Sequence, residues 1–381
     1  MSAASSFLTE RAPEHVRAIA PYVGGKPIDE VARELKLDPA TIIKLASNEN
    51  PRGPSPKALA AIAAAAGDLT RYPDGNGFAL KAALSNRFGV RPEQLVLGNG
   101  SNDVLELATQ AFLREGDSAV YSQYAFVVYP LATQARGAHG IEVPAKDHAH
   151  DLDAMRAAIM PGTKIVFVAN PNNPTGTWLT GAAVESFIAS VPKDVIVVLD
   201  EAYNEFLEPS EQSASIKWLP KFPNLIVSRT FSKAYGLAAL RIGYGVMDAA
   251  LADLLNRVRQ PFNVNSLAQA AAIAALDDVD YVTESRRLNR EGLRQLEAGL
   301  EALSIRYVRS HGNFILIDVG DAAAVNLALL RQGIIVRPVA NYGLPSFLRV
   351  TVGLPAENAR FLAALESAIS KRPSAESRAD R

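Results

Sequence analysis

The chain of 381 residues contains no cysteine. It therefore has no disulfide framework, no thiolate zinc site and no cysteine nucleophile. Long apolar runs are missing too, because the longest one, residues 58–66, is mostly alanine and much shorter than a bilayer span. Residues 1–22 lack the continuous apolar segment of a signal peptide. We therefore expect a cytoplasmic protein without membrane spans.

Neither sign of charge dominates the sequence. Lysine and arginine together number 39, against 40 aspartates and glutamates, so the net charge is −1. This balance gives no electrostatic footprint for nucleic acid or for an anionic membrane. The only close pair of histidines, His148 and His150, has polar surroundings that predict a surface loop rather than a metal site. We expect no metal.

The sequence does have a globular composition, with 48% hydrophobic residues, and enough length for two domains. Between residues 55 and 245, short β-branched runs alternate with helical stretches such as 103–113 and 179–190. This alternation predicts an α/β fold with a mostly parallel sheet flanked by helices. The predicted strands are residues 94–97, 118–121, 164–169, 195–199, 225–228 and 243–246.

After about residue 250 the pattern changes to a long helical region that runs towards residue 302. Shorter strands are predicted at 304–308, 314–319, 334–337 and 348–352, with helices at 321–332 and 355–369. These elements predict a smaller α+β domain. We expect an N-terminal arm with part of the small domain over 1–45, a large domain over 46–255 and a small domain over 256–381.

A glycine-rich segment, GNGSND at residues 98–103, follows the first predicted strand and precedes a helix. Glycines let a backbone approach a ligand closely, and a helix N-terminus attracts anions. The segment therefore predicts a phosphate cradle. Two alternatives are a plain capped turn and a dinucleotide fingerprint, although Asp103 stands where that fingerprint has its third glycine.

Polar residues also end the next two strands. In PNNPTG at 171–176, Asn173 lies in a tight turn from which it could hydrogen-bond an aromatic hydroxyl or an oxyanion. Asp200 ends a run of buried apolar residues in VIVVLDEAY, which is costly for a carboxylate unless a cation meets it. It is either a helix cap or a partner for a protonated ring nitrogen, with Tyr203 close by.

The segment SRTFSKAYGLAALR at 228–241 contains Lys233. Taken alone, this segment favours a lysine that is a charge on the surface. However, all four segments follow strands of one predicted sheet, where open α/β sheets bind ligands, so they can face one crevice. This conjunction of a glycine turn, an asparagine turn, Asp200 and Lys233 predicts a catalytic site.

The combination resembles the fold-type I pyridoxal-phosphate aminotransferases over nearly the whole chain, and most closely their histidinol-phosphate aminotransferase branch. The resemblance implies a seven-stranded sheet in the large domain and a homodimer. It rests on SNENPRGP (47–54), RYPDG (71–75), GNGSND (98–103), PNNPTG (171–176), DEAY (200–203), TFSKAYGLAALRIGY (230–244) and LRVTVG (348–353).

The resemblance also implies roles for the residues that meet the cofactor, pyridoxal 5′-phosphate. Lys233 bonds to its aldehyde and later moves a proton, and Asp200 keeps its ring nitrogen protonated. Tyr203 and Asn173 hydrogen-bond its ring oxygen. Phe126 stacks on the ring, or Tyr124 if the register slips. The implied phosphate ligands are Gly100, Ser101, Asn102, Thr230, Ser232, Arg241 and, from the partner subunit, Tyr72.

For the substrate, the resemblance implies recognition of an anionic group by Arg349, with Arg337, Asn48 and Tyr22 nearby. The expected reaction converts histidinol phosphate and 2-oxoglutarate into imidazole-acetol phosphate and glutamate, in histidine biosynthesis. An aromatic amino-acid aminotransferase and a phosphothreonine-type decarboxylase are alternatives on the same fold. A nicotinamide-dependent oxidoreductase and a non-catalytic regulator are further alternatives. The regulator would need an added basic DNA-binding domain, which we do not expect in this sequence.

Overall fold

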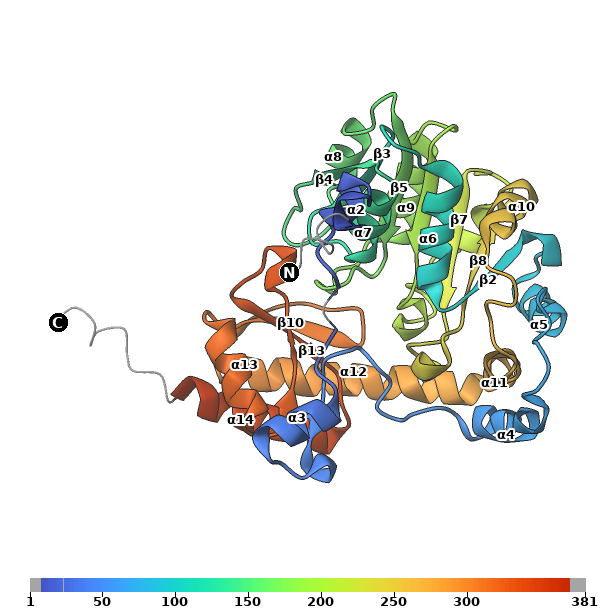
Figure 1. The fold of residues 1–381 in the computed structure, drawn as a ribbon. Helices are drawn as coiled ribbons and strands as arrows, with labels where there is room; N and C mark the ends of the chain where they lie inside the picture. The colour runs from blue at the N-terminus through green and yellow to red at the C-terminus, as the bar shows by residue number, and fades with distance from the viewer. Residues whose placement is uncertain (1–7, 23, 371–381) are drawn as a thin grey trace.

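The computed structural model describes residues 8–22 and 24–370. A large unit built on one broad sheet lies beside a smaller unit, and the long helix α12 (Val279–Ala302) extends from the first to the second (Figure 1). Among the described residues, none of the helices has both the length and the apolar character needed to cross a membrane.

The large sheet has seven strands in the order β2-β8-β7-β6-β5-β3-β4. Every pairing between β7 and β4 is parallel, and only β8 runs against its two neighbours. The predicted α/β fold with a mostly parallel, seven-stranded sheet is confirmed. The strands are β2 (Leu95–Gly98), β3 (Ser118–Ser122), β4 (His139–Val143), β5 (Thr163–Ala169), β6 (Ile196–Asp200), β7 (Leu225–Thr230) and β8 (Gly243–Met247).

Helices cover both faces of this sheet because its strands are apolar on both sides. In β6, Val197 and Leu199 belong to one hydrophobic cluster, and Ile196 and Val198 belong to the other. Side chains alternate across a strand, so the two clusters mark the two faces. The first face packs against α4 (Pro56–Ala65), α5 (Phe78–Phe88), α8 (Leu152–Ala157), α9 (Gly181–Ser190) and α11 (Ser266–Leu276), and the second against α6 (Ser101–Phe112), α7 (Val128–Ala135) and α10 (Ala249–Val258).

The smaller unit is built on a four-stranded antiparallel sheet in the order β12-β13-β10-β9, covered by the end of α12 and by two later helices. A separate parallel pair joins β1 to β11. The elements are β1 (Ile43–Lys44), β9 (Arg306–Val308), β10 (Phe314–Asp318), β11 (Ile334–Ile335), β12 (Arg337–Pro338), β13 (Phe347–Thr351), α13 (Ala322–Leu330) and α14 (Pro355–Ser370).

The two-residue strand β1 is not among the predicted strands, and two further details differ from the sequence prediction. The edge strand β4 was missed, because its HGIEV sequence is mostly exposed and has no continuous apolar run. The predicted strand 334–337 is two strands, since β11 pairs with β1 whereas β12 pairs with β13. Neither difference changes the architecture.

The N-terminal segment connects the two units. The short helix α2 (Glu14–Arg17) lies against α7 of the large unit, whereas α3 (Ile28–Leu35) packs onto β11 of the smaller unit (Figure 1). Tyr22 and Gly25, which lie between these helices in the sequence, line the cavity described next.

Candidate active site

A cavity of about 200 Å³ lies where the carboxyl ends of the large sheet's strands face the smaller unit. The turn after β2, the ends of β5 and β6 and the segment after β7 all contribute to its wall. The expected common crevice is therefore present. Its lining from the large unit includes Gly100, Ser101, Asn102, Phe126, Asn173, Asp200, Tyr203, Thr230, Ser232, Lys233 and Arg241, and the remaining wall includes Tyr22, Asn48, Arg337 and Arg349.

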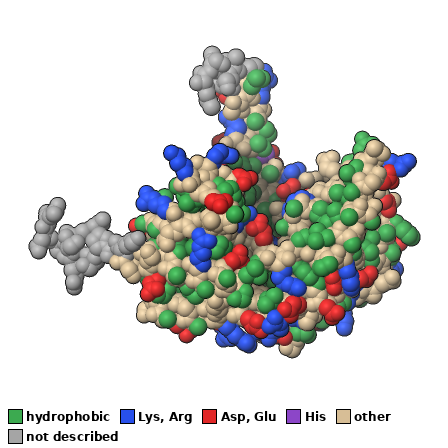
Figure 2. All heavy atoms as spheres, turned by 90° about the horizontal axis from the view of Figure 1, so that it is seen from below, with side chains coloured by type: hydrophobic (Ala, Val, Ile, Leu, Met, Phe, Trp, Pro, Cys, Tyr) green, Lys and Arg blue, Asp and Glu red, His purple; other side chains and the backbone are tan. Residues whose placement is uncertain are grey.

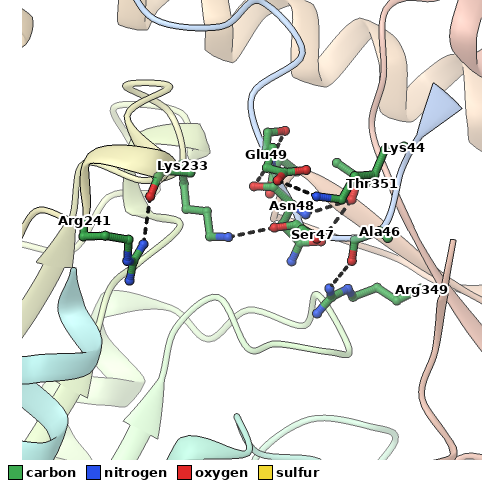
Figure 3. A network of polar contacts seen from close by, with 11 residues as sticks. Lys44, Ala46, Ser47, Asn48, Glu49, Lys233, Arg241, Arg349 and Thr351 are labelled. Atoms are coloured by element: carbon green, nitrogen blue, oxygen red, sulfur yellow. Dashed lines mark hydrogen bonds and ion pairs between the residues drawn. The ribbon is translucent and has the colours of Figure 1, made fainter. Parts of the chain in front are cut away.

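Lys233 reaches into the cavity from the turn after β7. Its Nζ donates a hydrogen bond of 3.0 Å to the carbonyl of Ser47, and Arg241 and Arg349 lie on either side of it (Figure 3). Burial, assisted by these two arginines, lowers the pKa of Lys233 to about 7. The amine is therefore largely neutral just above neutral pH, as a nucleophile or a base must be.

The turn that carries Lys233 depends on a glycine. Gly236 has a φ of 71°, and a Cβ there would lie 2.1 Å from the carbonyl oxygen of Gly53. Neither the backbone angle nor the space accepts a side chain. This contact holds the lysine turn against the segment that contains Ser47.

Asp200 ends β6 and faces the cavity while nearly buried. Its Oδ2 accepts a hydrogen bond of 2.8 Å from the hydroxyl of Tyr129, and its Oδ1 accepts one from the backbone of Ala202. Burial raises the pKa of Asp200 to about 6, although both hydrogen bonds act in the opposite direction. A cationic group that meets this carboxylate in the cavity would be strongly favoured.

Tyr129 itself is fully buried and firmly held. Its ring stacks on Phe167 with centroids 4.6 Å apart and an interplanar angle of 4°. The ring of Phe126 meets it edge-on at 5.9 Å. The hydroxyl of Tyr129 is thus fixed with respect to Asp200 by two aromatic contacts.

Tyr203 lies on the same wall, with its hydroxyl 2.9 Å from the Nδ2 of Asn48, which donates to it. Burial raises the pKa of Tyr203 to about 12, so this hydroxyl keeps its proton. Asn48 comes from the segment before the large unit and is anchored by Thr351 on β13. This hydrogen bond joins the smaller unit to the cavity wall.

Two arginines of the smaller unit enter the cavity and both are nearly buried. Arg349 donates to Oδ1 of Asn173 at 2.5 Å and to the carbonyl of Ala46 at 2.8 Å, while its Nε has no partner among the described residues. Arg337 lies with its guanidinium 5.4 Å from the ring of Tyr22. Buried cations of this kind are suited to an anionic ligand.

A corner lined by hydrogen-bond donors forms between the turn after β2 and Arg241. Gly100 precedes the first turn of α6, and it has no side chain with which to cap that turn. Arg241 reaches the same corner, donating to the hydroxyl of Ser232 at 3.5 Å and to the carbonyl of Asn99 at 3.3 Å. Helix N–H groups, a hydroxyl and a guanidinium together make a phosphate-sized donor set.

The corner is narrow because backbones meet there. A Cβ on Gly243, the first residue of β8, would lie 2.5 Å from both the carbonyl carbon of Gly100 and the nitrogen of Ser101. A Cβ on Gly100 would lie 2.7 Å from Nη2 of Arg241. Only glycine fits at these positions, which is the reason this turn is glycine-rich.

Not every predicted residue lines the cavity. Phe126 does, whereas Tyr124 stacks on His148 at 5.7 Å outside it. Tyr72 is 82% exposed, away from the cavity of its own chain. The prediction that the histidine pair lies in a surface loop is wrong for His150, which is buried with Nε2 2.8 Å from the carbonyl of Ala169, a contact between segments that sequence spacing does not reveal.

Tyr129 and Tyr342 also line the cavity, and so do Ala46 and Ser47, whose backbone carbonyls accept hydrogen bonds there. None of these four is predicted as a site residue. The aromatic residues resemble ordinary core residues in sequence, and a carbonyl has no sequence signal at all. Within residues 8–22 and 24–370, no cluster of three or more His, Cys, Asp or Glu side chains could hold a metal ion.

The fold and the cavity define a class of protein. The family model "Aminotransferase class I and II" matches residues 40–365, and the chain belongs to this family. Two similar proteins are 60% identical, the histidinol-phosphate aminotransferases 2 of Ralstonia nicotianae, over 367 residues, and of Pseudomonas aeruginosa, over 362. Each alignment covers 95% of this chain and 98% of the relative.

A solved structure agrees with these relatives. The histidinol-phosphate aminotransferase from Sinorhizobium meliloti, in complex with pyridoxal 5′-phosphate, is 30% identical and superposes with a TM-score of 0.87. The match covers 94% of this chain and 98% of that one.

Proposed function

We propose that this chain is a cytoplasmic, pyridoxal-phosphate-dependent aminotransferase of histidine biosynthesis. It transfers the amino group of histidinol phosphate to 2-oxoglutarate, giving imidazole-acetol phosphate and glutamate. The observation that carries this proposal is the weakly basic Lys233, which lies between Arg241 on one side and Arg349 on the other. The names of the relatives at 60% identity supply the particular substrate.

The donor set around Gly100 fits the phosphate of the cofactor. Its members are Arg241, the hydroxyls of Thr230 and Ser232, and the uncapped first turn of α6 with Ser101 and Asn102. The buried Asp200 carboxylate, which lines the same cavity, fits a protonated ring nitrogen. Phe126 is the aromatic residue on the cavity wall that can cover a ring face.

Bound pyridoxal phosphate supplies an aldehyde for the amino group and a ring that takes up the electron pair left at the substrate's α-carbon. The neutral Nζ of Lys233 would hold the aldehyde end of the cofactor, and the same amine would serve as the base that moves the proton of the substrate's α-carbon. Asp200 would keep a proton on the ring nitrogen. Tyr203 and Asn173 would hydrogen-bond the ring oxygen and so orient the ring.

Arg349 recognises the anionic end of each substrate, with Arg337, Tyr22 and Asn48 completing the subsite. A guanidinium can donate two parallel hydrogen bonds either to a phosphate or to a carboxylate. One arginine can therefore receive the phosphate of histidinol phosphate in one half of the reaction and the carboxylate of 2-oxoglutarate in the other.

An exposed apolar surface on the large unit supports a homodimer. Large side chains are exposed at Leu59, Leu69, Tyr72, Phe78 and Phe262, and Tyr72 stacks on Phe262 at 4.8 Å. Seen from below, apolar side chains cover much of the right-hand part of the molecule, where α4 and α11 lie (Figure 2). Such a surface favours association with a second copy, in which Tyr72 would reach the partner's cofactor phosphate.

A substrate panel tests the proposal. The purified protein, loaded with pyridoxal phosphate, is incubated with 2-oxoglutarate and either histidinol phosphate, phenylalanine or phosphothreonine. We expect glutamate to form fastest with histidinol phosphate. Glutamate from phenylalanine only would assign an aromatic aminotransferase, carbon dioxide from phosphothreonine a decarboxylase, and no glutamate from histidinol phosphate would refute the proposal.

Replacing Tyr129 by phenylalanine tests its part in positioning Asp200. The hydrogen bond from Tyr129 lowers the pKa of Asp200, so its loss should raise that pKa while the stacked ring remains. Cofactor affinity should fall at low pH, where Asp200 becomes protonated. Because the lost hydrogen bond is to a charged group, the midpoint of this fall, the acid limb of the pH profile, should move upward by about one pH unit. Affinity is measured by absorbance titration of the cofactor-free protein between pH 5 and 8.

Tyr121→Phe is the matched control, because Tyr121 belongs to the same hydrophobic cluster but does not line the cavity. A purely structural role for Tyr129 would lower the melting temperature and leave the acid limb where it is in the wild type. That result would contradict the positioning role.

A further inference from the structure

A second cavity, of about 260 Å³, lies behind the segment that carries Lys233. Its walls come from the end of α5, the 3-10 helix η4 (Asn204–Phe206), β7 and the start of α12. It shares no lining residue with the candidate active site. Arg229 and Thr230 are neighbours on β7 whose side chains point to opposite faces, so one strand separates the two cavities.

A buried carboxylate oxygen without a hydrogen-bond partner lies in this second cavity. Glu205 is 8% exposed and Tyr235 is 6% exposed. Oε2 of Glu205 accepts no hydrogen bond from any described residue, and Tyr235 lines the same cavity. Buried polar groups are normally satisfied, and the proposed reaction uses neither residue.

The cations of this cavity lie nearer its rim. Arg87 is exposed and Arg286 is half-buried, and neither forms an ion pair or a hydrogen bond within residues 8–22 and 24–370. The third arginine, Arg229, is committed to Glu201 by hydrogen bonds of 2.9 and 2.7 Å. The cavity therefore offers free positive charge at its mouth and a free acceptor in its depth.

This arrangement selects the ligand by charge. Glu205 would repel a ligand that carries only negative charge, and Arg87 and Arg286 would repel a ligand that carries only positive charge. A small zwitterion satisfies both ends, and the volume is below the range of ordinary drug-sized pockets. Apolar residues complete the wall: Phe88, Leu276, Val279 and Val282.

We infer that this cavity binds a free α-amino acid. Its ammonium group is held by Glu205 and the hydroxyl of Tyr235, its carboxylate by Arg87 and Arg286, and its side chain packs on Leu276 and the start of α12. The ligand would touch Arg229, which precedes Thr230, and Tyr235, which follows Lys233 by two residues. Occupancy of the cavity would thus restrain, from behind, the segment that holds the catalytic lysine.

The test is calorimetric titration of the cofactor-loaded protein after borohydride treatment, which blocks turnover. L-leucine is the probe, and inorganic phosphate and methylamine are the single-charge comparators. We expect one leucine site outside the active site, with Arg87→Ala and Glu205→Gln each weakening it roughly tenfold or more, since each loses a charged hydrogen bond. Phosphate and methylamine should bind more weakly than leucine.

Arg331→Ala is the control, because Arg331 is an exposed arginine outside the described cavities. Melting temperatures show that each variant is folded. Absence of leucine binding, leucine affinity unchanged in both cavity variants, or tighter binding of phosphate would overturn the inference. None of these results bears on the glutamate assay, so the proposed reaction is judged separately.

Discussion

Replacing Lys233 by alanine should abolish transamination while leaving a folded protein. The side chain supplies both the nucleophile and the proton-transfer base, so the rate should fall by about 10³-fold or more. Within the described residues its Nζ donates only to the carbonyl of Ser47, and its pKa of about 7 means that the cavity disfavours the charged amine. Loss of the amine should therefore cost little stability.

The measurement combines the glutamate assay with a melting curve and peptide mass analysis. In the wild-type protein, borohydride should attach pyridoxal phosphate irreversibly to the peptide that contains Lys233, and in the variant to no peptide. Lys193→Ala removes an exposed lysine and should behave as wild type. A folded Lys233→Ala protein with near-normal turnover would disprove the role given to this residue.

Asp200→Asn should have the second largest effect on activity. The amide has the same shape but cannot hold a proton on the ring nitrogen, so turnover should fall by about 10²–10⁴-fold. The phosphate corner around Arg241 is untouched, and the cofactor should still bind. Asp194→Asn, which changes an exposed carboxylate, is the control.

Stability supplies an independent test of the same variant. Burial raises the pKa of Asp200 from 3.8 to about 6, so the wild-type, cofactor-free protein loses stability as the pH rises through this range. Asparagine does not titrate. The variant should therefore be at least as stable as wild type at pH 8, and its relative advantage should shrink as the pH falls towards 4. The quantity to compare is the free energy of unfolding of the variant minus that of wild type. If this difference were smaller at pH 8 than at pH 4, the result would contradict the burial of a charged carboxylate.

The sequence predicted the sheet and much of the cavity for one physical reason. Strands buried on both faces are continuous apolar runs, and polar residues directly after parallel strands must meet at one edge. Asn173, Asp200 and Lys233 all follow this rule and all line the cavity. The rule fails for β4, an edge strand whose exposed residues have no apolar pattern.

Other parts of the site could not be predicted, because they depend on contacts between distant segments. The hydrogen bond from Tyr129 to Asp200 links a helix on one face of the sheet to the end of a strand. Burial of His150 depends on a carbonyl of β5. Sequence motifs identify side chains at strand ends, but they carry no information on which buried aromatic hydroxyl will meet them.

The short segment that contains Ala46 and Ser47 has a consequence for how the protein tolerates change. The carbonyl of Ala46 accepts from Arg349, and the next carbonyl, that of Ser47, accepts from Lys233 (Figure 3). Consecutive peptide units thus act as a spacer of fixed length between two cations, one in each unit of the protein. Substitutions that keep this backbone path leave both acceptors where they are, but an insertion or deletion of a single residue would exchange or misdirect them. Chimeras between relatives should accordingly be joined outside this segment, because its length matters more than its composition.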